Sequence, residues 1–175
     1  MFKKILAFAV IAFLSPLLRA QQFNSQDFQK RFEDARYGDL KKIKYFGSIH
    51  VRLKNEKSTK IDLNEEELVD YLRLRYKNNF GSVPYRNLGV NMVTLGLKEA
   101  STVGRLWCGV WTVGDDFPVA YHVECSFGSM ERLQILTDAA LGYGNKKNVP
   151  ETIKKTLDDM LSQFAIQFFK TRGDM

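Results

Sequence analysis

Apolar and polar side chains alternate along residues 42–54, KIKYFGSIHVRLK. One face of this alternation is apolar and consists of Ile43, Tyr45, Ile49, Val51 and Leu53. The other face is polar and consists of Lys44, Ser48, His50, Arg52 and Lys54. Because successive side chains of a strand point to opposite faces of a sheet, the pattern predicts a strand with one buried face.

Residues 63–81, LNEEELVDYLRLRYKNNFG, carry the signals of a helix. Asn64 and Glu67 fit a variant of the capping box. The three consecutive glutamates at 65–67 suit the positive end of the helix dipole. We therefore interpret these acids as capping groups, and not as a metal site or an acid–base cluster.

Two further helices are expected nearer the ends of the chain. The spacing of Phe28, Phe32 and Ala35 predicts a helix over residues 24–38. The last helix is predicted to begin at Asn148, with a proline in its first turn. Its apolar residues form a single stripe: Ile153, Leu157, Met160, Leu161, Phe164 and Phe168.

Three or four further strands are predicted, at roughly residues 90–97, 104–113, 118–127 and 132–140. We interpret LGYG, residues 141–144, as a turn before the last helix and not as a phosphate-binding loop. The order of elements predicts an α+β fold. Its architecture is a two-layer sandwich, with one mixed or antiparallel sheet of about five strands and helices packed on one face.

The first twenty residues, MFKKILAFAVIAFLSPLLRA, resemble a signal peptide. Lys3 and Lys4 precede an apolar stretch of ten residues, which is shorter than the roughly twenty that a membrane span needs. We expect cleavage after Ala20; an uncleaved anchor or a buried helix is the alternative. The predicted organisation is a signal peptide at 1–20, an N-terminal helical segment at 21–40 and one α+β domain at 41–175. The mature chain is then periplasmic or secreted, with no membrane span.

Removal of residues 1–20 also changes the charge. The whole chain has 26 basic and 20 acidic residues, a net charge of +6. Lys3, Lys4 and Arg19 leave with the leader, so the mature chain has a net charge of +3. A small excess spread over a mixed surface does not indicate nucleic-acid binding.

The residue types used in catalysis are scarce. The chain has two histidines, His50 and His122, and neither belongs to a zinc-binding pattern. No serine-nucleophile elbow or phosphate-binding loop occurs, and Asp115 and Asp116 have the setting of a turn. We expect no metal, no cofactor and no enzymatic activity; a hydrolase with a dispersed site remains an alternative.

Residues 104–127, GRLWCGVWTVGDDFPVAYHVECSF, contain both cysteines and both tryptophans. A hairpin turn centred on Asp116 and Phe117 places Cys108 directly opposite Cys125, where Cβ atoms lie about 4.5–5.5 Å apart. Export places the chain in an oxidising compartment, so we predict a disulfide between them. Two buried reduced thiols are the alternative.

The same register places Trp107 and Trp111 on the other face of the hairpin, with His122 and Glu124. Two interpretations are open. In the first, a helix or loop shields both indoles; in the second, the four residues form a partly exposed binding surface for a glycan, a lipid or a protein. This surface is the only candidate site that the sequence offers.

The order of strand, capped helix (LNEEELVDYLRLRYKNNF), strands and closing helix (NVPETIKKTLDDMLSQFAIQFFK) resembles that of small exported α/β envelope domains. These are typified by the amino-terminal domain of TolB and the curli secretion pore protein. The resemblance covers roughly residues 40–170 and implies a periplasmic domain that binds other envelope proteins or assembles with itself.

The leading hypothesis for function is therefore a non-enzymatic exported envelope protein that acts through protein contacts or assembly. The alternative is a small-ligand or glycan-binding module that uses the face of Trp107 and Trp111.

Overall fold

The computed structural model describes residues 30, 34–56, 61–88, 96–115 and 117–175. The predicted leader at 1–20 lies outside these ranges, and so do most of the strand predicted at 90–97 and part of the helix predicted at 24–38. Residues 30 and 34–38 of that helix are described, and they are helical. Contacts divide the chain between Ala35 and Arg36, and the fold below is that of Arg36–Met175.

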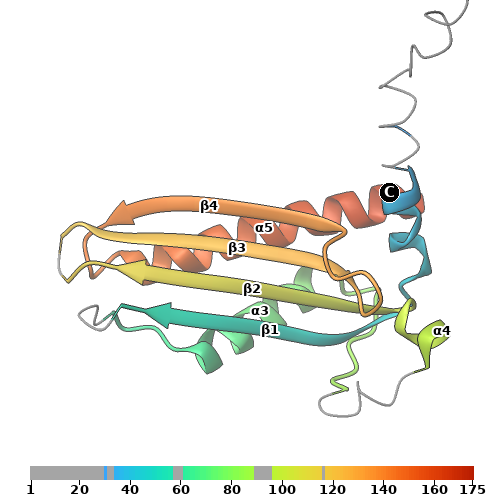
Figure 1. The fold of residues 1–175 in the computed structure, drawn as a ribbon, viewed down its shortest axis with the longest axis horizontal. Coiled ribbons are helices and arrows are strands. Elements are labelled where there is room, and N and C mark those ends of the chain that lie inside the picture. Colours follow the sequence, from blue (N-terminus) through green and yellow to red (C-terminus); the bar gives the residue numbers. More distant parts are fainter. Residues whose placement is uncertain (1–29, 31–33, 57–60, 89–95, 116) are drawn as a thin grey trace, which may run out of the picture. The chain divides into compact units, whose positions relative to one another are not determined.

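Four strands form one mixed sheet in the order β1-β2-β3-β4 (Figure 1). They are β1 (Tyr45–Asn55), β2 (Val103–Val113), β3 (Val119–Ser129) and β4 (Leu136–Gly144). β1 runs parallel to β2, and the other neighbours are antiparallel. The helices of this unit are the short 3-10 helix η1 (Leu40–Lys42), α3 (Glu65–Asn79), α4 (Leu97–Ala100) and α5 (Val149–Arg172).

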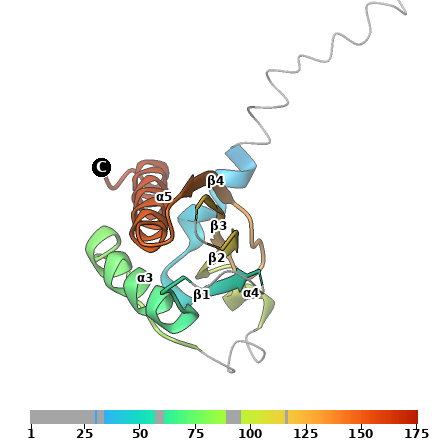
Figure 2. The same ribbon diagram turned by 90° about the vertical axis from the view of Figure 1, so that its left-hand side faces the viewer.

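The long helices α3 and α5 lie side by side on one face of the sheet (Figure 2). The parallel pair β1 and β2 requires a crossover connection, and α3 lies within it. Ion pairs join the two helices, from Lys154 Nζ to Glu67 at 2.6 Å and from Arg75 Nε to Asp158 at 3.4 Å. The predicted two-layer α+β fold with helices on one face is confirmed.

The prediction of about five strands was wrong, because the described sheet has four. The last residue of the strand predicted at 90–97, Leu97, begins α4, where the Gly96 carbonyl accepts hydrogen bonds from Glu99 and Ala100. The fourth strand also begins later than predicted, because residues 130–135 form a loop. LGYG at 141–144 is the end of β4 and not a turn.

The alternation in the first strand is confirmed over Ile49, Val51 and Leu53 but was wrong at Tyr45. The pairing of β1 with β2 skips Gly47, and this bulge reverses the faces. Phe46 is therefore fully buried, whereas Tyr45 is only partly buried.

Phe46 lies at the centre of an aromatic core. Its ring centroid is 4.7 Å from that of Tyr76, 5.3 Å from Phe80 and 5.0 Å from Phe127. The helices complete this core. The predicted apolar stripe of α5 is buried throughout: Ile153, Leu157, Met160, Leu161, Phe164 and Phe168.

The predicted capping of α3 is also confirmed. Asn64 Oδ1 accepts a hydrogen bond from the Glu67 backbone N–H at 2.8 Å. Glu65 accepts a hydrogen bond from Leu53 N at 2.9 Å, so these acids have structural partners.

Cys108 and Cys125 form a disulfide, as predicted. They lie directly opposite each other in β2 and β3 with Cα atoms 4.1 Å apart, and both are buried on the helix-covered face of the sheet. The register predicted for the hairpin is confirmed over its length, from Trp107 opposite Ser126 to Val113 opposite Ala120.

Reduction of the disulfide is expected to lower the free energy of unfolding by about 3 kcal/mol, because the bond restricts the unfolded chain over a separation of 17 residues. Denaturant unfolding of the oxidised protein, with and without a reductant, measures this difference. A Cys108→Ala/Cys125→Ala variant is the control, and its unfolding midpoint should be the same with and without the reductant. An unchanged midpoint for the reduced wild type would contradict the prediction.

Candidate functional site

The face of the sheet opposite α3 and α5 is called here the open face. Side chains alternate between the two faces along each strand, and Cys108, Val110 and Val123 point into the helix-covered core. The residues next to them in each strand therefore point to the open face. Its members on β1 and β2 are His50, Arg52, Lys54, Arg105, Trp107, Trp111 and Val113. Its members on β3 and β4 are Ala120, His122, Glu124, Ser126, Thr137, Ala139, Leu141 and Tyr143.

The two indoles lean over Gly109, which lies between them on β2. A Cβ atom at residue 109 would clash with the ring of Trp111 and would lie 2.8 Å from Cη2 of Trp107. The ring centroids of the two tryptophans are 6.3 Å apart, at an interplanar angle of 59°. The glycine therefore provides the space in which the indoles meet.

Trp111 also contacts His122, which lies directly opposite it on β3. Their ring centroids are 5.2 Å apart. Both tryptophans, His122 and Glu124 are partly exposed, and none of the four lies under α3 or α5. The hairpin thus brings together all four residues of the predicted surface, and their role in binding stays a prediction.

Charge and apolar character divide across the open face. Its β1 and β2 side carries Arg52, Lys54 and Arg105, and none of these forms an ion pair within the described part of the chain. Its β4 side carries Leu141 and Tyr143, which are strongly exposed. Both indoles project from β2, and Trp111 contacts His122 of β3.

The contribution of the last part of β4 to the open face was not predicted from the sequence. Leu141 and Tyr143 were assigned to a turn, although the alternation of Ala139, Leu141 and Tyr143 with Ala140 and Gly142 could have revealed the strand. On the core side Gly142 makes room for Tyr121, whose ring packs directly against it.

A pocket of about 240 Å³ lies at one end of the open face, beside the loop that joins β3 to β4. The described residues that line it are Arg105, Trp107, Ser126, Leu133 and Gln134. The Nε atom of Arg105 is buried and has no hydrogen-bond partner among the described residues. Arg105 is also the charged residue among the described residues that line the pocket, so its guanidinium is the group that an anionic ligand would meet there.

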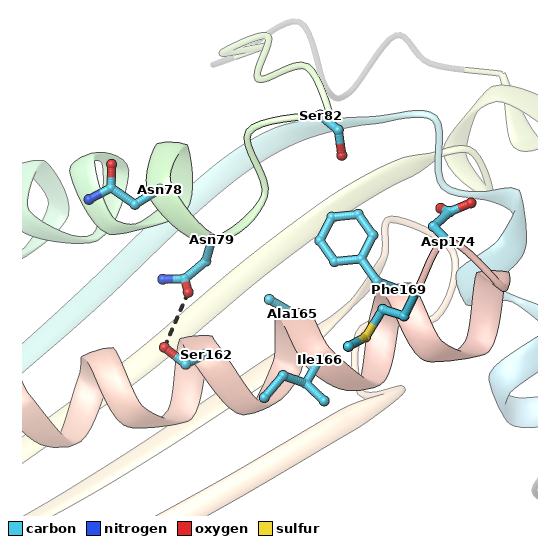
Figure 3. Close-up of a pocket in the computed structure, with 9 residues that line it drawn as sticks. Asn78, Asn79, Ser82, Ser162, Ala165, Ile166, Phe169 and Asp174 are labelled. Carbon is cyan, nitrogen blue, oxygen red and sulfur yellow. Dashed lines mark hydrogen bonds between the residues drawn. The ribbon is translucent and has the colours of Figure 1, made fainter.

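A second pocket, of about 400 Å³, lies between the C-terminal ends of α3 and α5 (Figure 3). Its polar groups are amides and hydroxyls, and Ser162 Oγ donates to Asn79 Oδ1 at 3.2 Å. Its carboxylate, Asp174, already accepts a hydrogen bond from Arg172 at 2.7 Å. The residues that line this pocket can bind polar groups, but they do not include a paired acid and base.

His50 lies beside Trp107 on the open face, in the register of β1 with β2. Partial desolvation lowers the pKa of His50, and the positive charge of Arg105 lowers it further. Within the described ranges, no three side chains of His, Cys, Asp or Glu gather to hold a metal ion. In the same part of the chain, no helix is long and apolar enough to cross a membrane.

Neither a family model nor a curated protein sequence matches the chain. Solved structures with distant similarity include an uncharacterized protein, with 10% identity and a TM-score of 0.39, covering 76% of this chain and 94% of that one. Another is a PelC dodecamer from Paraburkholderia phytofirmans, with 10% identity and a TM-score of 0.42, covering 69% and 88%. A third is a neuraminyllactose-binding hemagglutinin homolog from Helicobacter pylori, with 11% identity and a TM-score of 0.36, covering 73% and 88%.

These similarities are too distant to assign a function. The resemblance to TolB and curli pore domains also stays a prediction, because no family match supports it.

Gly109→Ala is expected to push both indoles away from the sheet, because the added methyl group occupies the space where they meet. Tryptophan fluorescence should shift to longer wavelength and the near-ultraviolet circular dichroism of the indoles should weaken. Gly38→Ala is the matched control, since a Cβ atom there meets nothing within 4 Å. Unchanged spectra for Gly109→Ala would contradict the described packing.

Arg105→Gln is expected to raise the pKa of His50, because it removes the nearby positive charge. His50 has a lowered pKa in the folded state, so its protonation reduces stability as the pH falls below the unfolded value of about 6.5. The variant should therefore lose less stability on acidification. An NMR titration of His50 measures the pKa, with Arg52→Gln as the control; the same pKa in wild type and Arg105→Gln would refute the coupling.

Proposed function

We propose that this chain is an exported, non-enzymatic protein of a bacterial envelope that acts by binding another protein. The contact surface is the hairpin-end patch, defined as Val113, Phe117, Leu141 and Tyr143. One observation carries the proposal: these apolar side chains are exposed together, with Leu141 at 81% and Tyr143 at 77%. Contiguous exposed apolar groups mark interaction sites on soluble proteins.

The register of the sheet explains why the patch is contiguous. Val113 lies opposite Ala120, which lies opposite Tyr143, so these residues form one row across the open face. Leu141 belongs to the next row, opposite His122. Phe117 lies between the end of β2 at Val113 and the start of β3 at Val119. Figure 1 shows that β2 ends and β3 begins at the end of the sheet where β4 finishes.

The edge of the sheet adds a second means of contact. β4 pairs only with β3 among the described strands, so its outer edge presents backbone groups over Leu136–Gly144. An exposed edge strand is a template for pairing with another chain. A partner can therefore combine backbone hydrogen bonds with burial of Leu141 and Tyr143.

Two features support export. The first is the leader-like sequence of residues 1–20, with its basic start and short apolar stretch. The second is the disulfide between Cys108 and Cys125, a bond that persists in oxidising compartments.

A second candidate function is the binding of a small ligand or glycan on the Trp107 side of the open face. The pocket beside Trp107 favours it, because this pocket combines an indole with polar side chains. Trp111 and His122 lie between this pocket and the hairpin-end patch.

Leu141→Lys is expected to weaken partner binding about tenfold or more, because it places a charge at the centre of a buried contact. The test replaces residue 141 with a photo-cross-linking amino acid in cells and identifies the cross-linked proteins from the envelope by mass spectrometry. A binding assay with the purified partner then compares wild type with Leu141→Lys.

Residue 74 provides the matched control. Leu74 is also an exposed leucine, at 59%, but it lies on α3, on the helix side of the fold. Leu74→Lys should bind the partner as the wild type does, and a cross-linker at residue 74 should not capture it. Equal cross-linking from both positions, or equal affinity of both lysine variants, would argue against the hairpin-end patch.

A further inference from the structure

The pocket beside Trp107 is a site separate from the hairpin-end patch. Trp107 and Val113 are six positions apart on β2, and a strand rises about 3.3 Å per residue, so these two residues are about 20 Å apart. The loop between β3 and β4 closes the pocket with Leu133 and Gln134. A ligand in the pocket therefore need not touch Leu141 or Tyr143.

The charge around the pocket selects an anion. Arg105 lines it, and the buried Nε atom of this residue has no hydrogen-bond partner. Arg105 also forms no ion pair within the described residues, and its direct partner on β1 is the uncharged Ser48, so Arg105 supplies the positive charge at the pocket. The planar fork of a guanidinium matches the geometry of a carboxylate.

The other side chains select a ring with hydroxyl groups. Trp107 is partly exposed and offers a flat apolar surface for the C–H face of a sugar ring. Ser126 and Gln134 both donate and accept hydrogen bonds, as neighbouring hydroxyl groups require. The volume of about 240 Å³ is below the usual range of about 300–1,000 Å³ for ligand pockets, so it suits a single ring.

We infer that this pocket binds an acidic sugar, with Arg105 on the carboxylate, Trp107 against the ring and Ser126 and Gln134 on the hydroxyl groups. A nucleic-acid strand fits less well, because such strands are held by several cations along their phosphates, whereas the described residues that line this pocket include one guanidinium. An anionic membrane surface also attracts clusters of cations, in place of a single cation in a concave site.

The test titrates the oxidised protein with glucuronate, galacturonate and N-acetylneuraminate, each beside its methyl ester. The ester keeps the ring and removes the charge. The indole N–H resonance of Trp107 reports binding. At least one acid should shift this resonance saturably, and its ester should bind about tenfold more weakly, which corresponds to the loss of one charge-assisted contact. No saturable shift with any acid, or equal binding of acid and ester, would overturn the inference.

Variants identify the residues that bind the sugar. Arg105→Gln should weaken binding of the acid about tenfold and leave binding of the ester unchanged. Gln134→Ala, in the exposed loop, should weaken both ligands and keeps the test valid if Arg105→Gln fails to fold. Arg52→Gln is the matched control, because Arg52 lies on the same face outside the pocket and has no ion pair within the described residues. This variant should bind the acidic sugar with the affinity of the wild type.

Two further experiments distinguish sugar binding in this pocket from membrane binding and from the partner site. Vesicles containing phosphatidylglycerol test a membrane surface: binding to them that depends on Arg105, without any response to sugars, would overturn the inference. Leu141→Lys should bind the sugar normally, and Arg105→Gln should bind the protein partner normally. Each site can therefore be tested without the other. If Leu141→Lys and Arg105→Gln each lost both sugar binding and partner binding, the proposal of two separate sites would be contradicted.

Discussion

The pairing of β2 with β3 is the constraint on which the rest of the structure depends. These strands are the centre of the sheet, and the disulfide between Cys108 and Cys125 joins them at directly opposite positions. A slip of one residue would move every side chain of a strand to the other face. The covalent bond prevents this slip, so Val110 and Val123 stay in the core while Trp107 and Trp111 stay on the open face.

The same pairing separates the open face into two ends with different chemistry. At the pocket end, Arg105 and Trp107 combine positive charge with an indole. At the hairpin end, Leu141 and Tyr143 expose apolar surface. The indoles of Trp107 and Trp111 meet above Gly109, between the two ends. The same sheet therefore carries a polar pocket and an exposed apolar surface on one face.

The sequence predicted most of this fold because its local signals agree with the tertiary structure. The stripe of α5, the Asn64 cap and the hairpin register all follow from spacing along the chain. Tyr45 was misassigned because the bulge at Gly47 reverses the faces of β1, and a bulge leaves no change in composition. The pocket could not be predicted, since Gln134 reaches Trp107 through a loop whose path depends on the late start of β4.

The two edges of the sheet are not equivalent. Residues Pro84, Arg86 and Leu88 make backbone hydrogen bonds to Phe46 and Gly47 at the start of β1, and Glu65 accepts one from Leu53 near its end. Growth of the sheet by a further strand is thus directed to β4. If that strand were the β4 of a second copy, antiparallel pairing would relate the copies by a two-fold axis perpendicular to the sheet. Both open faces would then point the same way, so the joined sheet would carry both pockets on one side.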